Sequence, residues 1–161
     1  MEFKVFNIEF DGIDKSGKDT IMKQIFSADP NKYIPKSRGL ISQIAYSKLN
    51  NRNYIYNVNK GYLDNTLFVY LTVDEDDWKI RCDLTNELVV DRSRCDTQNN
   101  VRLNYNSHMN AFNYAYNEVY NMLEDKRQIM SFNTSEMTPY AIITQVIAVL
   151  NELNGISGNE N

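Results

Sequence analysis

Apolar residues in this chain fall into short strand-like runs separated by stretches of helical spacing. The runs FKVFNIEF (3–10) and TLFVYLTV (66–73) combine aromatic and β-branched residues, and the second is apolar almost throughout. Such a continuous run is typical of a strand buried on both faces of a parallel sheet. Two shorter runs, NKYIPK (31–36) and RQIMSF (127–132), predict further strands, and Pro35 confines the first of them to an edge or an end of the sheet.

The stretches between these runs repeat their apolar residues at the spacing of amphipathic helices. Helices are expected over residues 18–26, 39–49, 74–87, 108–123 and 139–153. Pro139 suits the start of the last helix and Gly155 its end. Residues 50–65 and 88–103 show no convincing period and are interpreted as loops, and residues 155–161 are interpreted as a disordered tail.

Strands that alternate with helices predict an α/β fold with a mostly parallel central sheet of about four or five strands and helices on both faces. A chain of 161 residues is the usual size of one domain, here residues 1–154. No apolar run approaches the roughly 20 residues that span a bilayer, and the N-terminus resembles no secretory signal, so we expect a cytoplasmic protein without membrane partners. The net charge of -4 argues against an extended nucleic-acid-binding surface and favours a small-molecule partner.

The segment GIDKSGK (12–18) fits the phosphate-binding pattern G-x-x-x-x-G-K and lies between a predicted strand and a predicted helix, as that pattern requires. Backbone amides of such a loop cradle a β-phosphate, and Lys18 adds positive charge toward the β and γ groups. The alternative is a chance match to the pattern. The prediction is ATP binding by eight residues: Gly12, Asp14, Lys15, Ser16, Gly17, Lys18, Asp19 and Thr20.

The pattern ordinarily ends in a hydroxyl residue that binds Mg²⁺, whereas this chain has Asp19 there and Thr20 next. A carboxylate is also a hard oxygen ligand, so Asp19 and Thr20 are the candidate metal ligands. The alternative is that the extra negative charge of Asp19 repels the triphosphate. Lys15 and Lys18 lie close enough in sequence to offset that charge.

Several segments resemble the thymidylate kinases, a family of P-loop nucleoside monophosphate kinases. FDGIDKSGKDT (10–20) is similar to the family loop F-E-G-x-D-x-x-G-K-[ST]-T, which also carries the acidic residue at Asp14. SRGLISQIAYS (37–47) resembles D-R-[YF]-x-x-S-x-x-A-[YF], with Arg38, Ser42, Ala45 and Tyr46 at corresponding positions. Residues 66–81 and 127–150 resemble the family's strand and helix before the lid and its closing strand, loop and helix.

The resemblance implies a three-layer P-loop NTPase fold and a kinase that uses ATP and Mg²⁺ to phosphorylate a deoxynucleoside monophosphate, with dTMP as the expected acceptor. It further implies that Arg38 binds the acceptor phosphate, that Ser42 and Tyr46 contribute to the acceptor site, and that Tyr46 lies against the sugar. Lys15 corresponds to a catalytic arginine of some members, while Arg92 and Arg94 correspond to the lid arginines of others. A homodimer is also implied.

Two departures from the family pattern leave other functions open. Ser37 replaces the aspartate of the Asp-Arg pair, and only about twenty residues separate Lys18 from Arg38, which leaves no room for the family's acceptor clasp. One hypothesis is that Asp19 supplies the missing carboxylate. The alternatives are a kinase that acts on a base or an end within DNA, and a nucleotide-binding regulatory protein without catalysis.

Overall fold

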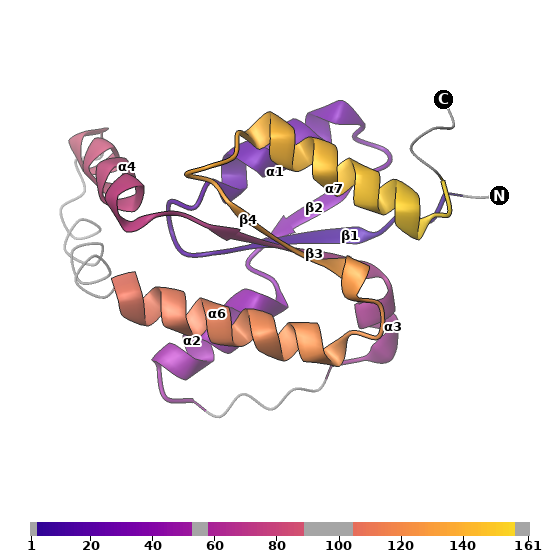
Figure 1. Ribbon diagram of the computed structural model, residues 1–161, viewed down its shortest axis with the longest axis horizontal. Helices are drawn as coiled ribbons and strands as arrows, with labels where there is room; N and C mark the ends of the chain where they lie inside the picture. Colours follow the sequence, from indigo (N-terminus) through magenta and orange to yellow (C-terminus); the bar gives the residue numbers. More distant parts are fainter. Residues whose placement is uncertain (1–2, 53–57, 89–104, 157–161) are drawn as a thin grey trace.

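The computed structural model describes residues 3–52, 58–88 and 105–156. Its sheet has four parallel strands in the order β2-β1-β3-β4, and helices cover both faces (Figure 1). The predicted α/β class with a parallel sheet between two helical layers is therefore confirmed. No helix in the described segments is long and apolar enough to cross a membrane.

The two central strands are the most buried. β1 (Asn7–Asp11) pairs on one side with β2 (Ile34–Ser37) and on the other with β3 (Thr66–Thr72), and β4 (Ile129–Asn133) completes the sheet beyond β3. β3 is buried along almost its whole length, as its apolar sequence predicts. β2 is an edge strand, which confirms the inference from Pro35, although it begins three residues later than expected.

One helical layer consists of α1 (Lys18–Ala28) and α7 (Pro139–Leu153), which lie side by side above the sheet in Figure 1. α7 begins as expected with Pro139, and the hydroxyl of Thr138 caps it by accepting a hydrogen bond from the Ala141 amide. The core under this layer contains Ile8, Phe10, Ile21, Ile25, Leu67, Val69, Leu71, Ile142 and Val146.

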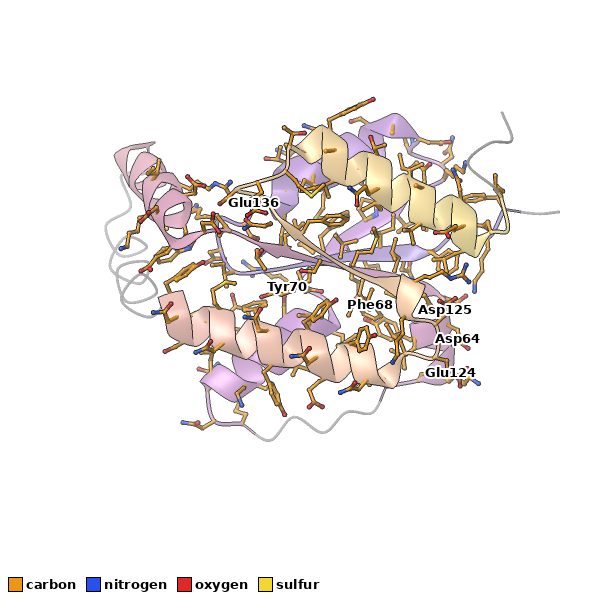
Figure 2. All side chains as sticks on the ribbon, viewed as in Figure 1. Asp64, Phe68, Tyr70, Glu124, Asp125 and Glu136 are labelled. Carbon is orange, nitrogen blue, oxygen red and sulfur yellow. The ribbon has the colours of Figure 1, made fainter. Side chains whose placement is uncertain are left out.

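The opposite layer consists of α2 (Leu40–Leu49) and α6 (Tyr105–Met122). Phe68 and Tyr70 of β3 point toward α6 in Figure 2, and the Tyr70 ring stacks on Phe112 with their centroids 6.3 Å apart. Because successive residues of β3 face opposite layers, one strand supplies both cores. α4 (Glu75–Leu88) follows β3 at the carboxyl edge of the sheet.

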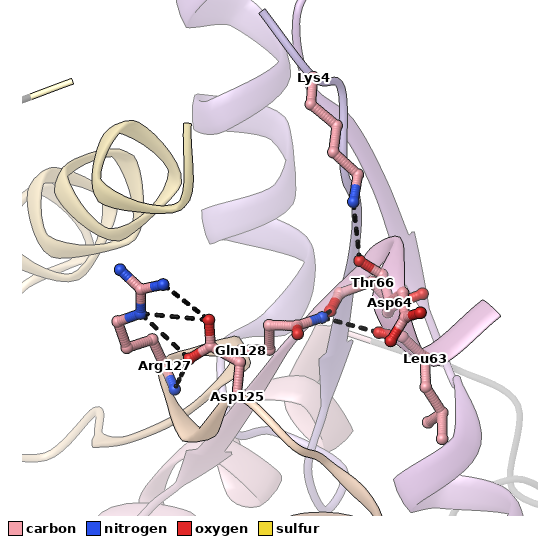
Figure 3. Close-up of polar contacts among 7 residues, drawn as sticks. All are labelled: Lys4, Leu63, Asp64, Thr66, Asp125, Arg127 and Gln128. Atoms are coloured by element: carbon pink, nitrogen blue, oxygen red, sulfur yellow. Dashed lines mark hydrogen bonds and ion pairs between the residues drawn. The ribbon is translucent and has the colours of Figure 1, made fainter. Parts of the chain in front are cut away.

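The expectation of a loop over residues 50–65 is wrong in part, because Lys60–Asp64 form a short helix, α3. Five residues are too few to show a helical period, and the signal is the preceding Asn59, whose side chain accepts from the Gly61 amide. Figure 3 shows how Gln128, in the 3-10 turn η1 (Lys126–Gln128), fixes the end of α3. Its amide donates to the carbonyls of Leu63 and Thr66.

Candidate functional site

Residues 12–17, between β1 and α1, form a tight loop around the ammonium group of Lys18. Gly17 has φ 97°, in the left-handed region that favours glycine, and α1 begins at the next residue. The ammonium of Lys18 turns back over the loop and donates to the carbonyls of Gly12 at 2.5 Å and Ile13 at 3.3 Å. The positive charge of Lys18 thus lies at the centre of the loop.

Four charged residues act on the Lys18 ammonium, and the sequence singles out three of them, Asp14, Asp19 and Arg38. Burial lowers its pKa from the usual value, and the nearby carboxylates of Asp14, Asp11 and Asp19 oppose that change, whereas Arg38 adds to it. These four residues come from the loop, the end of β1, the start of α1 and the turn before α2. The fold therefore brings Arg38 into electrostatic range of Lys18.

Helix α4 holds the loop from outside through two side chains. The indole of Trp78 donates to the carbonyl of Asp14 at 3.0 Å. The guanidinium of Arg81 donates to the carbonyl of Lys15 at 2.8 Å and to the Thr134 hydroxyl at 3.0 Å. The sequence analysis did not select Arg81, because a single arginine on a helix resembles a solvated surface charge.

A cavity of about 400 Å³ opens beside the loop, on the side of α1 and α7. Six of its lining residues are Lys15, Gly17, Thr20, Arg81, Thr134 and Pro139. The apolar side chains of Ile21, Met137 and Ile142 line the rest. A volume of this size, with apolar walls and a few polar groups, is typical of a site for one small organic ligand.

Two buried carboxylates of β1, Glu9 and Asp11, are a part of the site that the sequence analysis missed. Oδ1 of Asp11 accepts from the amide of Gly39 at 2.7 Å and from both the amide and the hydroxyl of Ser42. Oε1 of Glu9 accepts from the Leu40 amide at 2.9 Å. Together these carboxylates hold the first turn of α2 against the end of β1.

Asp11 is fully buried, and its Oδ2 has no hydrogen-bond partner among the described residues. Burial raises the pKa of Asp11 to about 6, and the negative charge of Glu9 acts in the same direction. Hydrogen bonds from Ser42 and Gly39 oppose this rise. The signal in the sequence was a pair of carboxylates, Glu9 and Asp11, that alternate with the apolar Ile8 and Phe10 in one strand.

The three expected acceptor residues differ in their surroundings. Arg38 is exposed at the tip of the turn before α2 and has φ 57°. Burial and the Asp14 carboxylate raise the pKa of Tyr46, while Arg38 lowers it, so Tyr46 lies in the same electrostatic environment as Arg38. Ser42 is buried, and its hydroxyl is engaged by Asp11 instead of facing solvent.

A second cavity, of about 420 Å³, lies on the α2 side of the sheet. Its lining includes Glu9, Lys36, Arg38, Gln43, Asn59 and Tyr62. It has no lining residue in common with the first cavity. The first cavity thus borders the loop itself, whereas the second is lined by residues of β1, β2, the start of α2 and the segment around α3.

Asp19 and Thr20 lie in the exposed first turn of α1, and Thr20 also lines the first cavity. Among the described residues, no three His, Cys, Asp or Glu side chains form a metal cluster. A Mg²⁺ ion that arrives with a nucleotide takes most of its ligands from phosphate and water, so one or two protein oxygens are enough. The hard oxygens of Asp19 and Thr20 fit such an ion.

Some predicted features lie outside the described residues. These are Arg92, Arg94 and nearly all of the lid-like segment 88–103, together with residues 157–161 of the tail. The chain matches no protein-family model, no curated protein and no solved structure. The likeness of its motifs to those of thymidylate kinases therefore remains a resemblance.

Proposed function

We propose that this protein is a P-loop kinase that transfers the γ-phosphate of ATP, with Mg²⁺, to a deoxynucleoside monophosphate, with dTMP as the expected acceptor. The observation that carries the proposal is the loop of residues 12–17, which encloses the Lys18 ammonium beside a cavity of about 400 Å³. A parallel α/β sheet binds ligands at the carboxyl ends of its strands, which is where this loop begins.

The donor nucleotide binds with its phosphates on the loop and its base in the first cavity. Lys18 exchanges its bonds to the Gly12 and Ile13 carbonyls for bonds to the β and γ phosphates. Burial strengthens this interaction, because charges attract more strongly in a medium of low dielectric constant. Arg81 keeps the loop in position through the Lys15 carbonyl.

Asp19 and Thr20 would hold the Mg²⁺ ion at the start of α1. When bound, the ion neutralises negative charge on the phosphates. Oxygen ligands suit Mg²⁺, and Thr20 lines the cavity assigned to the nucleotide.

The acceptor phosphate binds at Arg38, within electrostatic range of Lys18. Phosphoryl transfer depends mainly on positive charge around the migrating group, and Lys15, Lys18 and Arg38 supply it from the described part of the chain. Arg92 and Arg94 are proposed to add charge from the lid-like segment. Tyr46 is proposed to contact the acceptor sugar.

The test is ADP release from Mg·ATP in the presence of each deoxy- and ribonucleoside monophosphate. We expect one deoxynucleotide to stimulate release and the Lys18→Ala variant to lose at least about 100-fold of the activity. Lys23→Ala, an exposed lysine of the same helix, is the matched control and should retain activity. ATP binding without stimulated release would instead indicate a regulatory protein, and stimulation only by DNA would indicate a nucleic-acid acceptor.

A further inference from the structure

The second cavity includes Arg38, the residue proposed to bind the acceptor phosphate. Its wall is built from three separate parts: the strands β1 and β2, the start of α2, and the segment around α3. Asn59 and Tyr62 come from that third part, which the sequence analysis interpreted as loop. The hydroxyl of Tyr62 donates to Glu9, so α3 is tied to the central strand.

Three backbone amides at the start of α2 are already bonded to the carboxylates of β1. Those of Gly39 and Ser42 donate to Asp11, and that of Leu40 donates to Glu9. A phosphate bound there therefore depends mainly on side chains. Lys36 and Arg38 are the two exposed cations that line the cavity, and Arg38 is the one that acts on Lys18.

The charges of the cavity determine which end of a nucleotide enters it. Among the lining residues, Glu9 is buried at 4% exposure and its carboxylate repels a phosphate, whereas the exposed Arg38 attracts one. Lys36 lies opposite Glu9 in the pairing of β1 with β2 and offers an ammonium donor. The amides of Gln43 and Asn59 and the apolar surfaces of Val58 and Leu40 complete a lining suited to an uncharged ring with polar edges.

We propose that this cavity binds the nucleoside part of a free mononucleotide acceptor, with the acceptor phosphate on Arg38 and the base between Lys36 and α3. This inference rests on the proposed kinase function and identifies the protein segment that takes the place of the missing clasp. A volume of about 420 Å³ accommodates one nucleoside unit. The acceptor is therefore a mononucleotide and not a base or an end within DNA.

The experiment is calorimetric titration of deoxynucleoside monophosphates, dTMP first, into the full chain without ATP. The Lys36→Met variant removes the ammonium and keeps the chain length, and we expect dTMP to bind about tenfold more weakly, the usual effect of losing a hydrogen bond to a charged group. The Val58→Trp variant fills the cavity and should abolish binding. Lys23→Met, at an exposed position of α1 away from the cavity, is the matched control and should bind dTMP like the wild type. ATP affinity should be unchanged in all three.

Several results would overturn the inference: no mononucleotide binds, dTMP binds equally well to the wild type and to both cavity variants, or a 5′-phosphorylated oligonucleotide binds more tightly than dTMP. A separate ATP titration of the wild type and of Lys18→Ala tests the donor site. If the wild type does not bind ATP, or if Lys18→Ala binds it equally well, the kinase proposal is overturned, and the dTMP titration would still decide the cavity. The two failures are thus distinguishable.

Discussion

The carboxyl group of Asp11 connects the loop of residues 12–17 to the start of α2. Asp11 directly precedes the loop that encloses Lys18, and its Oδ1 accepts three hydrogen bonds from Gly39 and Ser42 at the start of α2. The same position removes the carboxyl group from water and raises its pKa to about 6. The residue that orders the site therefore also makes the stability of the fold depend on pH.

The sign of this dependence follows from the pKa of Asp11 in the folded and unfolded chains. The folded pKa of about 6 exceeds the ordinary 3.8, so the folded protein binds the proton more tightly. The resulting stability is fully present below pH 3.8 and is lost as the pH rises through 6. The difference between these pKa values corresponds to about 3 kcal/mol of unfolding free energy.

We expect the Asp11→Asn variant to lack this dependence, since its side-chain carbonyl still accepts from α2 but does not titrate. Urea denaturation of both proteins between pH 4 and pH 8 measures it. The wild type should lose about 2.5 kcal/mol relative to the variant over that range, because part of the total is already lost at pH 4. Asp76→Asn, at an exposed carboxylate of α4, is the control and should follow the wild type. Parallel curves for the wild type and Asp11→Asn would contradict the prediction.

Among the secondary-structure elements, α4 does most to fix the loop. Trp78 and Arg81 are three residues apart, so they lie on the same face of the helix. Their side chains donate to the adjacent carbonyls of Asp14 and Lys15. Arg81 also donates to Thr134 in the connection between β4 and α7. One helix thus joins two segments that line the proposed ATP cavity.

We expect the Arg81→Lys variant to bind ATP about tenfold more weakly while remaining folded, because an ammonium cannot reproduce the planar fork that reaches both carbonyl and hydroxyl. Calorimetric titration gives the affinity, and the thermal midpoint reports on folding. Lys79→Ala on the same helix, where Lys79 pairs only with the exposed Glu75 in the described contacts, should bind ATP normally. Unchanged affinity in Arg81→Lys would mean that the loop keeps its shape without α4.

Trp78 is the only tryptophan of the chain, so the protein carries its own optical probe of the loop. Its indole is buried and bonded to Asp14. We expect saturating ATP to change the intensity or wavelength of its emission and expect no such change in Lys18→Ala. A constant emission in a wild-type sample that binds ATP by calorimetry would show that the Asp14 carbonyl does not move.

The elements that the sequence predicts well are those with long apolar patterns. The ends of β3 and α7 lie within a residue or two of the expected limits, because burial of a continuous apolar face decides both elements. α3 escapes detection because its five residues are held by the Asn59 cap and by Gln128, which is distant in sequence. The roles of Glu9 and Asp11 could not be predicted either, because their partners at the start of α2 lie about thirty residues away in the sequence.

At the scale of the whole molecule, the sheet is the structure that both proposed ligand sites share. β3 contributes Leu67, Val69 and Leu71 to the core under α1 and α7, and it contributes Phe68 and Tyr70 to the core under α2 and α6. The proposed ATP cavity borders the first layer and the proposed acceptor cavity the second. A ligand bound beside one helical layer should therefore raise the unfolding free energy of the other layer only if both layers unfold together with the sheet.

This coupling can be measured by weakening one layer and binding ligand to the other. Phe112 is fully buried between Tyr70 and Tyr46, so Phe112→Ala should lower the unfolding free energy by about 3–5 kcal/mol. ATP at about 100 times its Kd should add about 2.7 kcal/mol to a protein that unfolds as one unit. We expect ATP to raise the unfolding free energy by the same amount in the wild type and in Phe112→Ala, as measured by urea denaturation.

The Val146→Ala variant, in the core under α1 and α7, gives the corresponding measurement for the layer beside the proposed ATP cavity. A second transition in Phe112→Ala that ATP leaves unmoved would instead mean that the α2 and α6 layer unfolds on its own, and the acceptor cavity could then open while ATP stays bound.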